Sequence, residues 1–296
     1  MRIVVPIKAV PDLVEEIELT GDGAAIDREY LTFVLNEWDG QALEEALLLK
    51  DADGAKVVAV GLADDPDIDQ FLYTALAKGA DEAVKLVAAT ALGPPGPGGA
   101  SGADRAALLA AYLTAHPADL VITGVQAADD LDGQLPSRLA ALLDLPHVSV
   151  VIGVEPAQVE PAQVEPAQVE LAQVEPAQKE GGRDEDGGAS VTVRQEFAGG
   201  RCHELEVQLP AVIGVQSARQ APRYAPITRI RQAMNAGGLS ELVVPARAAG
   251  NALVVRRLHR PGTTGGAEMM TGSAREVAGQ IVGLLRARGL VKGSVP

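Results

Sequence analysis

The stretch DLVITGVQAADDLDGQLPSRLAALL, residues 119–143, carries the signals that decide the fold. Residues 119–123 form a short apolar run, which is typical of a buried strand in a parallel sheet. Residues 134–143 place leucine and alanine at helical spacing. Between the two lies a loop that begins at Gly124, ends at Gly133 and contains three aspartates. A strand, a glycine-bounded loop and a helix in this order predict one unit of an α/β sheet.

The same alternation extends to both sides of this stretch. Upstream, the pattern predicts strands at 2–8, 56–61 and 83–87, and helices at 40–50, 66–78 and 103–115. Downstream, it predicts strands at 147–154, 190–196, 202–209 and 211–215, with a hairpin turn at Gly199-Gly200. For the first helix, Asp39 is the expected N-cap and Asn36 opens the turn before it. The fold class is therefore α/β, with a mostly parallel sheet and helices on both faces.

A repeat interrupts this pattern. Val154 through Gln178 consists of five pentapeptides, four reading VEPAQ and one VELAQ. Regular prolines exclude a continuous helix, because each removes a backbone donor and clashes with the preceding turn. We expect a solvated, partly extended tether that continues to Gly188. Since loop-closure entropy grows only logarithmically with length, such an insert lengthens a surface loop at small cost.

Five segments follow from these features. They are an α/β core at 1–153, the insert at 154–188, strands completing the core at 189–215, an extended arm at 216–236 and a tail at 237–296. In the arm, Arg223 and Tyr224 lie between two prolines and form either an interface anchor or a local turn with a stacked arginine. The tail contains an amphipathic helix at 273–290, and Ser273 with Glu276 fits a capping box.

Composition excludes several classes of function. The net charge is −15, and residues 155–186, with nine acidic and two basic residues, contribute nearly half of it. The remainder has no basic stripe, so nucleic acid is not an expected partner. No apolar run of about 18 residues is present, so we expect no membrane insertion. With Cys202 as the only cysteine and no export signal, the expected location is the cytoplasm.

The opening loop is the best candidate for a binding site. Ligands of open α/β sheets bind at the carboxyl ends of the strands, where this loop lies. Its glycines let backbone N–H groups approach a ligand, and the helix start at 134 favours a phosphate. An acidic, capped surface loop is the alternative, because neither G-x-G-x-x-G nor a P-loop is present. Four scattered histidines and one cysteine predict no metal site, and the sequence shows no catalytic residue.

Five stretches together resemble the beta (small) subunit of electron-transfer flavoproteins. In chain order they are VVPIKAVPD at 4–12, NEWD at 36–39 followed by ALEEA at 42–46, TALAKGAD at 74–81, the opening loop, and LPAV at 209–212 with PRYA at 222–225. The resemblance covers nearly the whole chain outside 155–188. It implies a Rossmann-like core of the adenine nucleotide alpha hydrolase kind, completed by a C-terminal arm and helix.

The resemblance also implies a function. The family pairs this subunit with a larger alpha subunit, which holds most of an FAD. The pair carries electrons from flavin-dependent dehydrogenases to an acceptor such as electron-transfer flavoprotein-quinone oxidoreductase. It is an electron carrier rather than an enzyme in itself, because the flavin performs the redox chemistry. The beta subunit buries AMP in ordinary members and a second FAD in electron-bifurcating ones.

Site residues are carried over by position. The nucleotide-contacting set would be Ala9, Asn36, Glu37, Trp38, Asp39, Gly61, Leu62, Gly124, Gln126, Ala127, Asp129, Asp130, Asp132, Gly133, Gln134 and Leu135. Trp38 falls near the alpha-subunit flavin in the family, although a single tryptophan is also common as buried scaffold. Leu13 replaces a tyrosine that some members place beside that flavin. Arg223 and Tyr224 belong to the partner-binding arm, whose tip is Ile227; the alternative is that Ile227 packs on its own domain.

Two departures from the family pattern leave alternatives open. Gln134-Leu135-Pro136 stands where the family often has Gln-Thr-Gly or Gln-Val-Gly, so a hydroxyl and one backbone donor are missing. The repeat insert is the second departure. The alternatives are a bifurcating subunit that oxidises NADH at its own FAD, and a stand-alone regulator that binds an adenine nucleotide without an alpha subunit.

Overall fold

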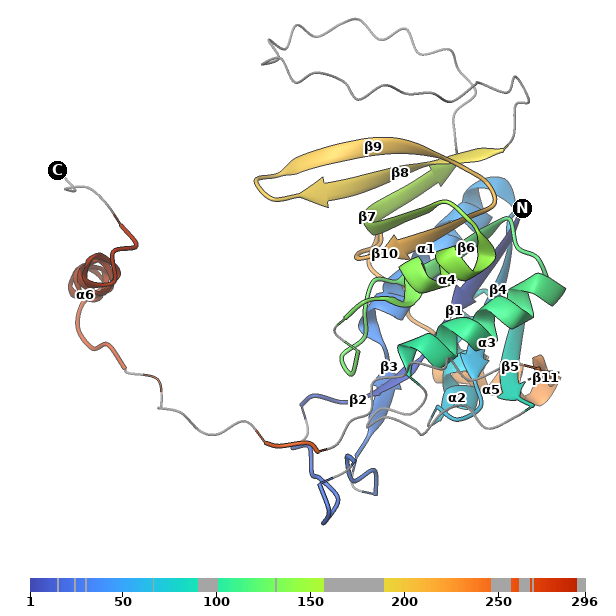
Figure 1. The fold of residues 1–296 in the computed structure, drawn as a ribbon, viewed down its shortest axis with the longest axis horizontal. Helices are drawn as coiled ribbons and strands as arrows, with labels where there is room; N and C mark the ends of the chain where they lie inside the picture. Colours follow the sequence, from blue (N-terminus) through green and yellow to red (C-terminus); the bar gives the residue numbers. More distant parts are fainter. Residues whose placement is uncertain are drawn as a thin grey trace, which may run out of the picture. The chain divides into compact units, whose positions relative to one another are not determined.

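A mostly parallel sheet organises the chain (Figure 1). The computed structural model describes residues 1–14, 16–23, 25–29, 31–65, 67–89, 101–130, 132–156, 189–245, 257–260, 267 and 269–291. The chain divides into two compact units, Met1–Leu258 and His259–Pro296. The sheet belongs to the first unit, and so does the candidate site.

Nine of the described strands form one sheet. Their order across it is β11 (Leu239–Val244), β5 (Glu82–Ala88), β4 (Lys56–Leu62), β1 (Arg2–Pro6), β6 (Leu120–Gly124), β10 (Ala211–Val215), β7 (His147–Pro156), β8 (Ser190–Phe197) and β9 (Arg201–Gln208). The pairs from β11 to β7 are parallel, and β7, β8 and β9 pair antiparallel. Two short strands, β2 (Ala9–Pro11) and β3 (Phe33–Leu35), form a separate antiparallel pair.

Helices cover both faces of the sheet, as the alternating pattern predicts. The helices of the first unit are α1 (Glu37–Asp53), α2 (Ile68–Lys78), α3 (Gly102–Ala115), α4 (Leu135–Leu143) and α5 (Ile227–Ala236). Helices α1 and α2 pack in one apolar cluster, and α3 and α4 pack in the other. The strand residues alternate between the two clusters, because successive side chains point to opposite faces. Ile3 and Val5 lie in the first cluster and Val4 in the second.

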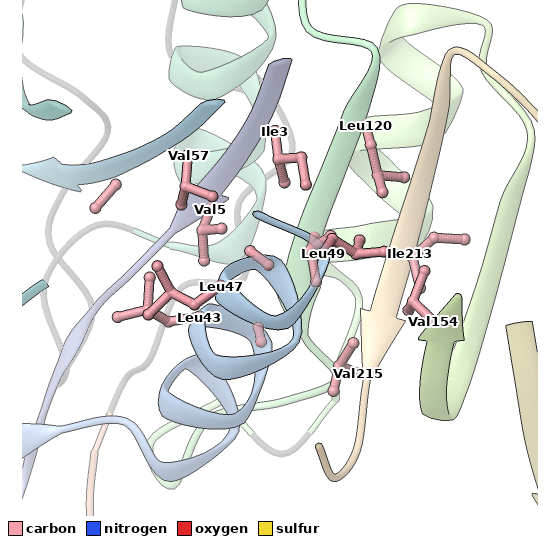
Figure 2. Close-up of a cluster of buried hydrophobic side chains, with 14 of the residues drawn as sticks. Ile3, Val5, Leu43, Leu47, Leu49, Val57, Leu120, Val154, Ile213 and Val215 are labelled. Carbon is pink, nitrogen blue, oxygen red and sulfur yellow. The ribbon is translucent and has the colours of Figure 1, made fainter. Parts of the chain in front are cut away.

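Leucines of α1 form the centre of the first cluster. Figure 2 shows Leu43, Leu47 and Leu49 facing side chains of the central strands, among them Val5 and Ile213. Each of these leucines is at most 1% exposed. Burying such a side chain contributes roughly 1.5–3 kcal/mol, so this contact fixes α1 on the sheet. The start of α1 is thereby held at the carboxyl edge of the central strands.

The structure confirms the strand–loop–helix unit of the opening stretch, as β6 and α4. It also confirms the hairpin at Gly199-Gly200 and, in the second unit, the capping box at the start of α6 (Ala274–Ala287). The expected N-cap of α1 is wrong: Asn36 occupies that position and Asp39 lies inside the first turn. The helical spacing of apolar residues begins only at residue 42, so the pattern does not indicate that the helix already starts at Glu37.

Three of the expected segments also need correction. The arm at 216–236 is not extended throughout, because residues 227–236 form α5, which begins after Pro226. Residues 239–244, assigned to the tail, form β11 and pair with β5 at the sheet edge. The repeat segment starts later than expected, since β7 continues to Pro156. The rest of the VEPAQ insert, 157–188, lies outside the described residues.

Candidate functional site

A pocket that is partly open to solvent lies at the carboxyl ends of β1, β4 and β6. This is the place where open α/β sheets bind ligands. Its lining consists of Pro6, Ile7, Lys8, Asn36, Asp39, Leu62, Arg105, Leu109, Gly124, Gln126, Ala127, Asp130, Gly133 and Leu135. The lining is apolar on several sides and carries a small number of polar groups, as nucleotide and cofactor pockets do.

The loop after β6 is tightly folded. Ala127 and Asp130 exchange two backbone hydrogen bonds, with N···O distances of 3.0 and 3.1 Å. Gly133 has a φ of +60°, and a Cβ there would lie 2.7 Å from the Val125 carbonyl oxygen. A Cβ at Gly124 would lie 2.8 Å from Trp38 backbone and side-chain carbons. The loop therefore needs glycine at both ends, once for conformation and once for the close approach of α1.

Asn36 and Asp39 form the polar centre of the pocket. Asn36 Nδ2 donates to the Gln126 carbonyl oxygen over 2.9 Å. Asp39 is 6% exposed, and burial raises its pKa to about 7, although hydrogen bonds from the Asn36 side chain and the Gly124 N–H oppose the shift. These bonds join the start of α1 to the β6 loop. Asp39 is therefore a titrating group at neutral pH.

Two cations border the pocket, and each has an acidic partner. Lys8 Nζ lies 2.6 Å from Asp129 Oδ1, and both side chains are largely buried. Arg105, on α3, contacts both carboxylate oxygens of Asp65 at 2.6 and 2.7 Å. Burial opposes its charge, yet Asp65 raises the pKa of Arg105, so the guanidinium stays charged. The positive charge of the pocket is thus already compensated by the protein.

The pocket brings together nine of the sequence-predicted positions. They are Asn36, Asp39, Leu62, Gly124, Gln126, Ala127, Asp130, Gly133 and Leu135. Of the others, Glu37, Asp132 and Gln134 are exposed, Gly61 packs on α2, and Asp129 pairs with Lys8. Ala9 lies in β2 and does not line the pocket; Pro6 of β1 does. Trp38 is half-buried and stands outside the lining.

Lys8 and Arg105 were not among the sequence-predicted site residues. Lys8 follows a buried strand, which is a usable signal for a residue at the carboxyl edge of the sheet. Arg105 gives no such signal, because it lies inside an alanine-rich helix that reads as an ordinary amphipathic segment. Only the packing of α3 against the sheet brings it to the pocket.

Comparison with known proteins agrees with the α/β fold. The family model for the electron transfer flavoprotein domain matches residues 24–246, well over half of the chain. The beta subunit of electron transfer flavoprotein from Methylophilus methylotrophus is 29% identical over 96% of this chain and 98% of its own length. The beta subunit from Syntrophomonas wolfei is 31% identical over 76% of this chain and 73% of its own length.

The chain belongs to the electron transfer flavoprotein beta-subunit family. A further relative, subunit CarD of the caffeyl-CoA reductase–Etf complex of Acetobacterium woodii, is 29% identical over 98% of this chain and all of its own. Members of this family are electron carriers that pair with an alpha subunit. Among the described residues, no acidic, histidine and cysteine side chains group as metal ligands, and no helix is long and apolar enough to cross a membrane.

In this family member the arm is tied to α1. Gln41 Oε1 accepts from the Ala218 N–H, Glu45 accepts from the Arg219 N–H, and Glu44 Oε2 accepts from the Arg223 N–H. Three backbone N–H groups of the arm therefore have acceptors on α1.

The three predicted partner-binding residues of the arm differ in exposure. Arg223 also reaches Glu44 and Asp51 with its guanidinium, so it is engaged within the chain. Tyr224 and Ile227 are 81% and 62% exposed. The structure thus separates an internal anchor, Arg223, from two exposed apolar side chains.

Proposed function

We propose that the chain is the beta subunit of a heterodimeric electron-transfer flavoprotein that binds AMP and helps to shield an FAD held mainly by the alpha subunit. The pair would carry electrons from flavin-dependent dehydrogenases to a downstream acceptor such as a quinone oxidoreductase. The observation that carries the proposal is the pocket at the sheet edge, where nine positions expected around a nucleotide converge.

The residues present fit an adenine nucleotide. Leu62, Leu109 and Leu135 offer apolar walls for a base. The backbone of the β6 loop and the first turn of α4 offer N–H donors for a phosphate. Pro136 occupies the first turn of α4 and supplies no N–H, which favours a single phosphate over a pyrophosphate. In this role AMP is structural, and this chain binds and encloses it.

The flavin would lie at the surface that the alpha subunit covers. Bound FAD supplies the redox chemistry, by accepting and passing on electrons. Leu13 and Val14 are 63% and 93% exposed, and Trp38, at the start of α1, is half-buried. We propose that these apolar side chains exclude water around the flavin. Helix α6 has no buried residue and carries Val277, Ile281 and Leu284 on one side, which suits packing on the alpha subunit.

The dehydrogenase would bind at the exposed side of the arm. Ile227 at the start of α5 is an anchor-type residue, since a large apolar side chain that is exposed can fill a pocket of a partner. Ile227→Ala should weaken dehydrogenase-dependent flavin reduction about five- to thirty-fold, equivalent to 1–2 kcal/mol of contact. Bound nucleotide should not change. Val243→Ala, which truncates an equally exposed residue of β11, is the control; equal rates for both variants would remove the anchor role.

A cofactor count tests the whole proposal. The chain is co-expressed with the alpha subunit of the same genome, the pair is purified and denatured, and released FAD and AMP are quantified. One FAD and one AMP per pair are expected. Two FAD and no AMP would instead support a bifurcating flavoprotein that oxidises NADH. Absence of a stable pair would favour a stand-alone nucleotide-binding regulator.

A further inference from the structure

Two buried polar atoms of the pocket have no hydrogen-bond partner among the described residues, and they are of opposite kind. Asn36 Oδ1 is an acceptor and Arg105 Nε carries a donor hydrogen. Their residues are 1% and 4% exposed, and both line the pocket. Leaving such groups unpaired costs about 1–3 kcal/mol each, so a ligand that pairs both would be strongly favoured.

The orientation of the Asn36 amide follows from its other contacts. Nδ2 has two hydrogens, and two acceptors face it: the Gln126 carbonyl oxygen at 2.9 Å and the Asp39 carboxyl group. A flipped amide would place an oxygen against both acceptors. Oδ1 is therefore the atom that remains for a ligand.

The guanidinium of Arg105 is equally fixed. Its two terminal nitrogens bind the two oxygens of Asp65 at 2.7 and 2.6 Å, and Asp65 is itself 4% exposed. This bidentate pair holds the planar group in one orientation and leaves Nε at its side. The Nε–H is thus a rigid, preoriented donor rather than part of a mobile side chain.

We propose that Arg105 is a base-contacting residue of the nucleotide site, whose Nε–H donates to a ring nitrogen of adenine while Asn36 Oδ1 accepts from the exocyclic amino group. Adenine carries a donor amino group next to ring-nitrogen acceptors, which matches one free acceptor and one free donor. This inference rests on the proposed function, and it assigns the residues that select the base.

Charge favours the base over the phosphate as the group that Arg105 contacts. Asp65 neutralises the guanidinium, and Asp64 and Asp129 add negative charge around it. A phosphate placed there would meet this acidic surrounding. Leu62 and Leu109 line the pocket together with Arg105, which suits a ring. The phosphate has better donors at the β6 loop and the first turn of α4.

Titration of the purified full-length chain with defined nucleotides tests the assignment. The wild-type protein should bind AMP at least tenfold more tightly than IMP, because hypoxanthine presents an oxygen where Asn36 Oδ1 needs a donor. Either 1-deaza-AMP or 7-deaza-AMP, each lacking one ring nitrogen, should also bind about tenfold more weakly. Equal affinity for AMP, IMP and both deaza analogues would overturn the inference without any variant.

The variant Arg105→Lys removes the Nε–H and keeps a cation for Asp65. It should weaken the binding of AMP and of adenosine by the same factor, about tenfold. It should also abolish the discrimination against whichever deaza analogue the wild-type protein binds more weakly than AMP. A merely structural role would not remove that discrimination. Arg194→Lys, which alters an exposed arginine paired with Glu204 in the hairpin, is the matched control.

The outcomes separate this inference from the proposed function. Unchanged binding by Arg105→Lys, or weaker binding of AMP with unchanged adenosine, would overturn the base contact and leave the nucleotide site intact. Failure of the wild-type chain to bind any adenine nucleotide, alone or paired with the alpha subunit, would overturn the proposed function and the base contact together.

Discussion

Helix α1 has buried polar side chains in its middle and at its start. Those in the middle find hydrogen-bond partners within the chain, whereas one at the start does not find a full set among the described residues. In its middle, Glu44 and Glu45 are bonded to the arm at Arg219 and Arg223. At its start, Asn36 keeps an acceptor without a partner among the described residues, and Asp39 has a pKa near neutrality. Paired buried groups fix a segment in place, whereas unpaired ones in a pocket indicate a ligand.

Removing a paired carboxylate should have the largest effect on stability. Glu45 is fully buried and accepts from the Arg219 and Val154 N–H groups, so Glu45→Ala leaves both donors unpaired. We expect a loss of about 3–5 kcal/mol in the free energy of unfolding, measured with urea. Glu82→Ala, which breaks the exposed pair with Lys56, should cost no more than about 1 kcal/mol. Similar losses for both variants would contradict the role of Glu45 in holding the arm and β7 on α1.

Asp39, at the start of α1, should make the stability of the protein depend on pH. Because burial raises the pKa of Asp39 from 3.8 to about 7, the folded state binds more protons than the unfolded state between these values. This group therefore lowers stability as pH rises from about 4 to 7, and no further above that. Asp39→Asn removes this pH dependence. The free energy of unfolding of the variant, relative to that of the wild type, should therefore rise by a few kcal/mol from pH 4 to 8. A difference in the free energy of unfolding between variant and wild type that is the same at pH 4 and pH 8 would contradict the raised pKa of Asp39.

The contact between α1 and the β6 loop should tolerate no added methyl group. Gly124→Ala places a Cβ 2.6 Å from Asp39 Oδ1 and 2.8 Å from Trp38, so we expect a loss of about 1–3 kcal/mol and weaker AMP binding. Gly40→Ala is the control within α1, where the new Cβ meets only Leu35 at 3.8 Å. That change should be neutral or stabilising by up to about 1 kcal/mol. Thermal unfolding of both variants checks the contrast.

The smallest effect on stability should come from deleting the repeats, which belong neither to the middle nor to the start of α1. Deletion of 157–186, which leaves β7 intact, removes the part of the VEPAQ insert that follows Pro156 and should change the free energy of unfolding by about 1 kcal/mol or less. Cofactor content should remain that of the full-length pair. Insoluble protein, or loss of the nucleotide, would show that the repeats contribute to the fold.

Local pattern predicted most of the fold. The apolar runs and helical spacing placed the central strands and α1 to α4 within a few residues, because a buried sheet and its covering helices need continuous apolar faces. The pattern missed the short strands β2 and β3, the edge strand β11 and helix α5. Residues 239–244 join the sheet only as an edge strand, and α5 is short and largely exposed, so neither has a strong hydrophobic signature.

The sequence by itself determined the α/β class, the place of the site at the end of β6 and the resemblance to a nucleotide-binding family. Only the tertiary structure decided which polar groups meet there. Lys8, Asn36, Asp65 and Arg105 come from separate parts of the chain, and their burial and pairing depend on how α1 and α3 pack against the sheet. Spacing along a chain carries no information about such long-range pairs, because each is fixed by the packing of whole elements rather than by its neighbours in sequence.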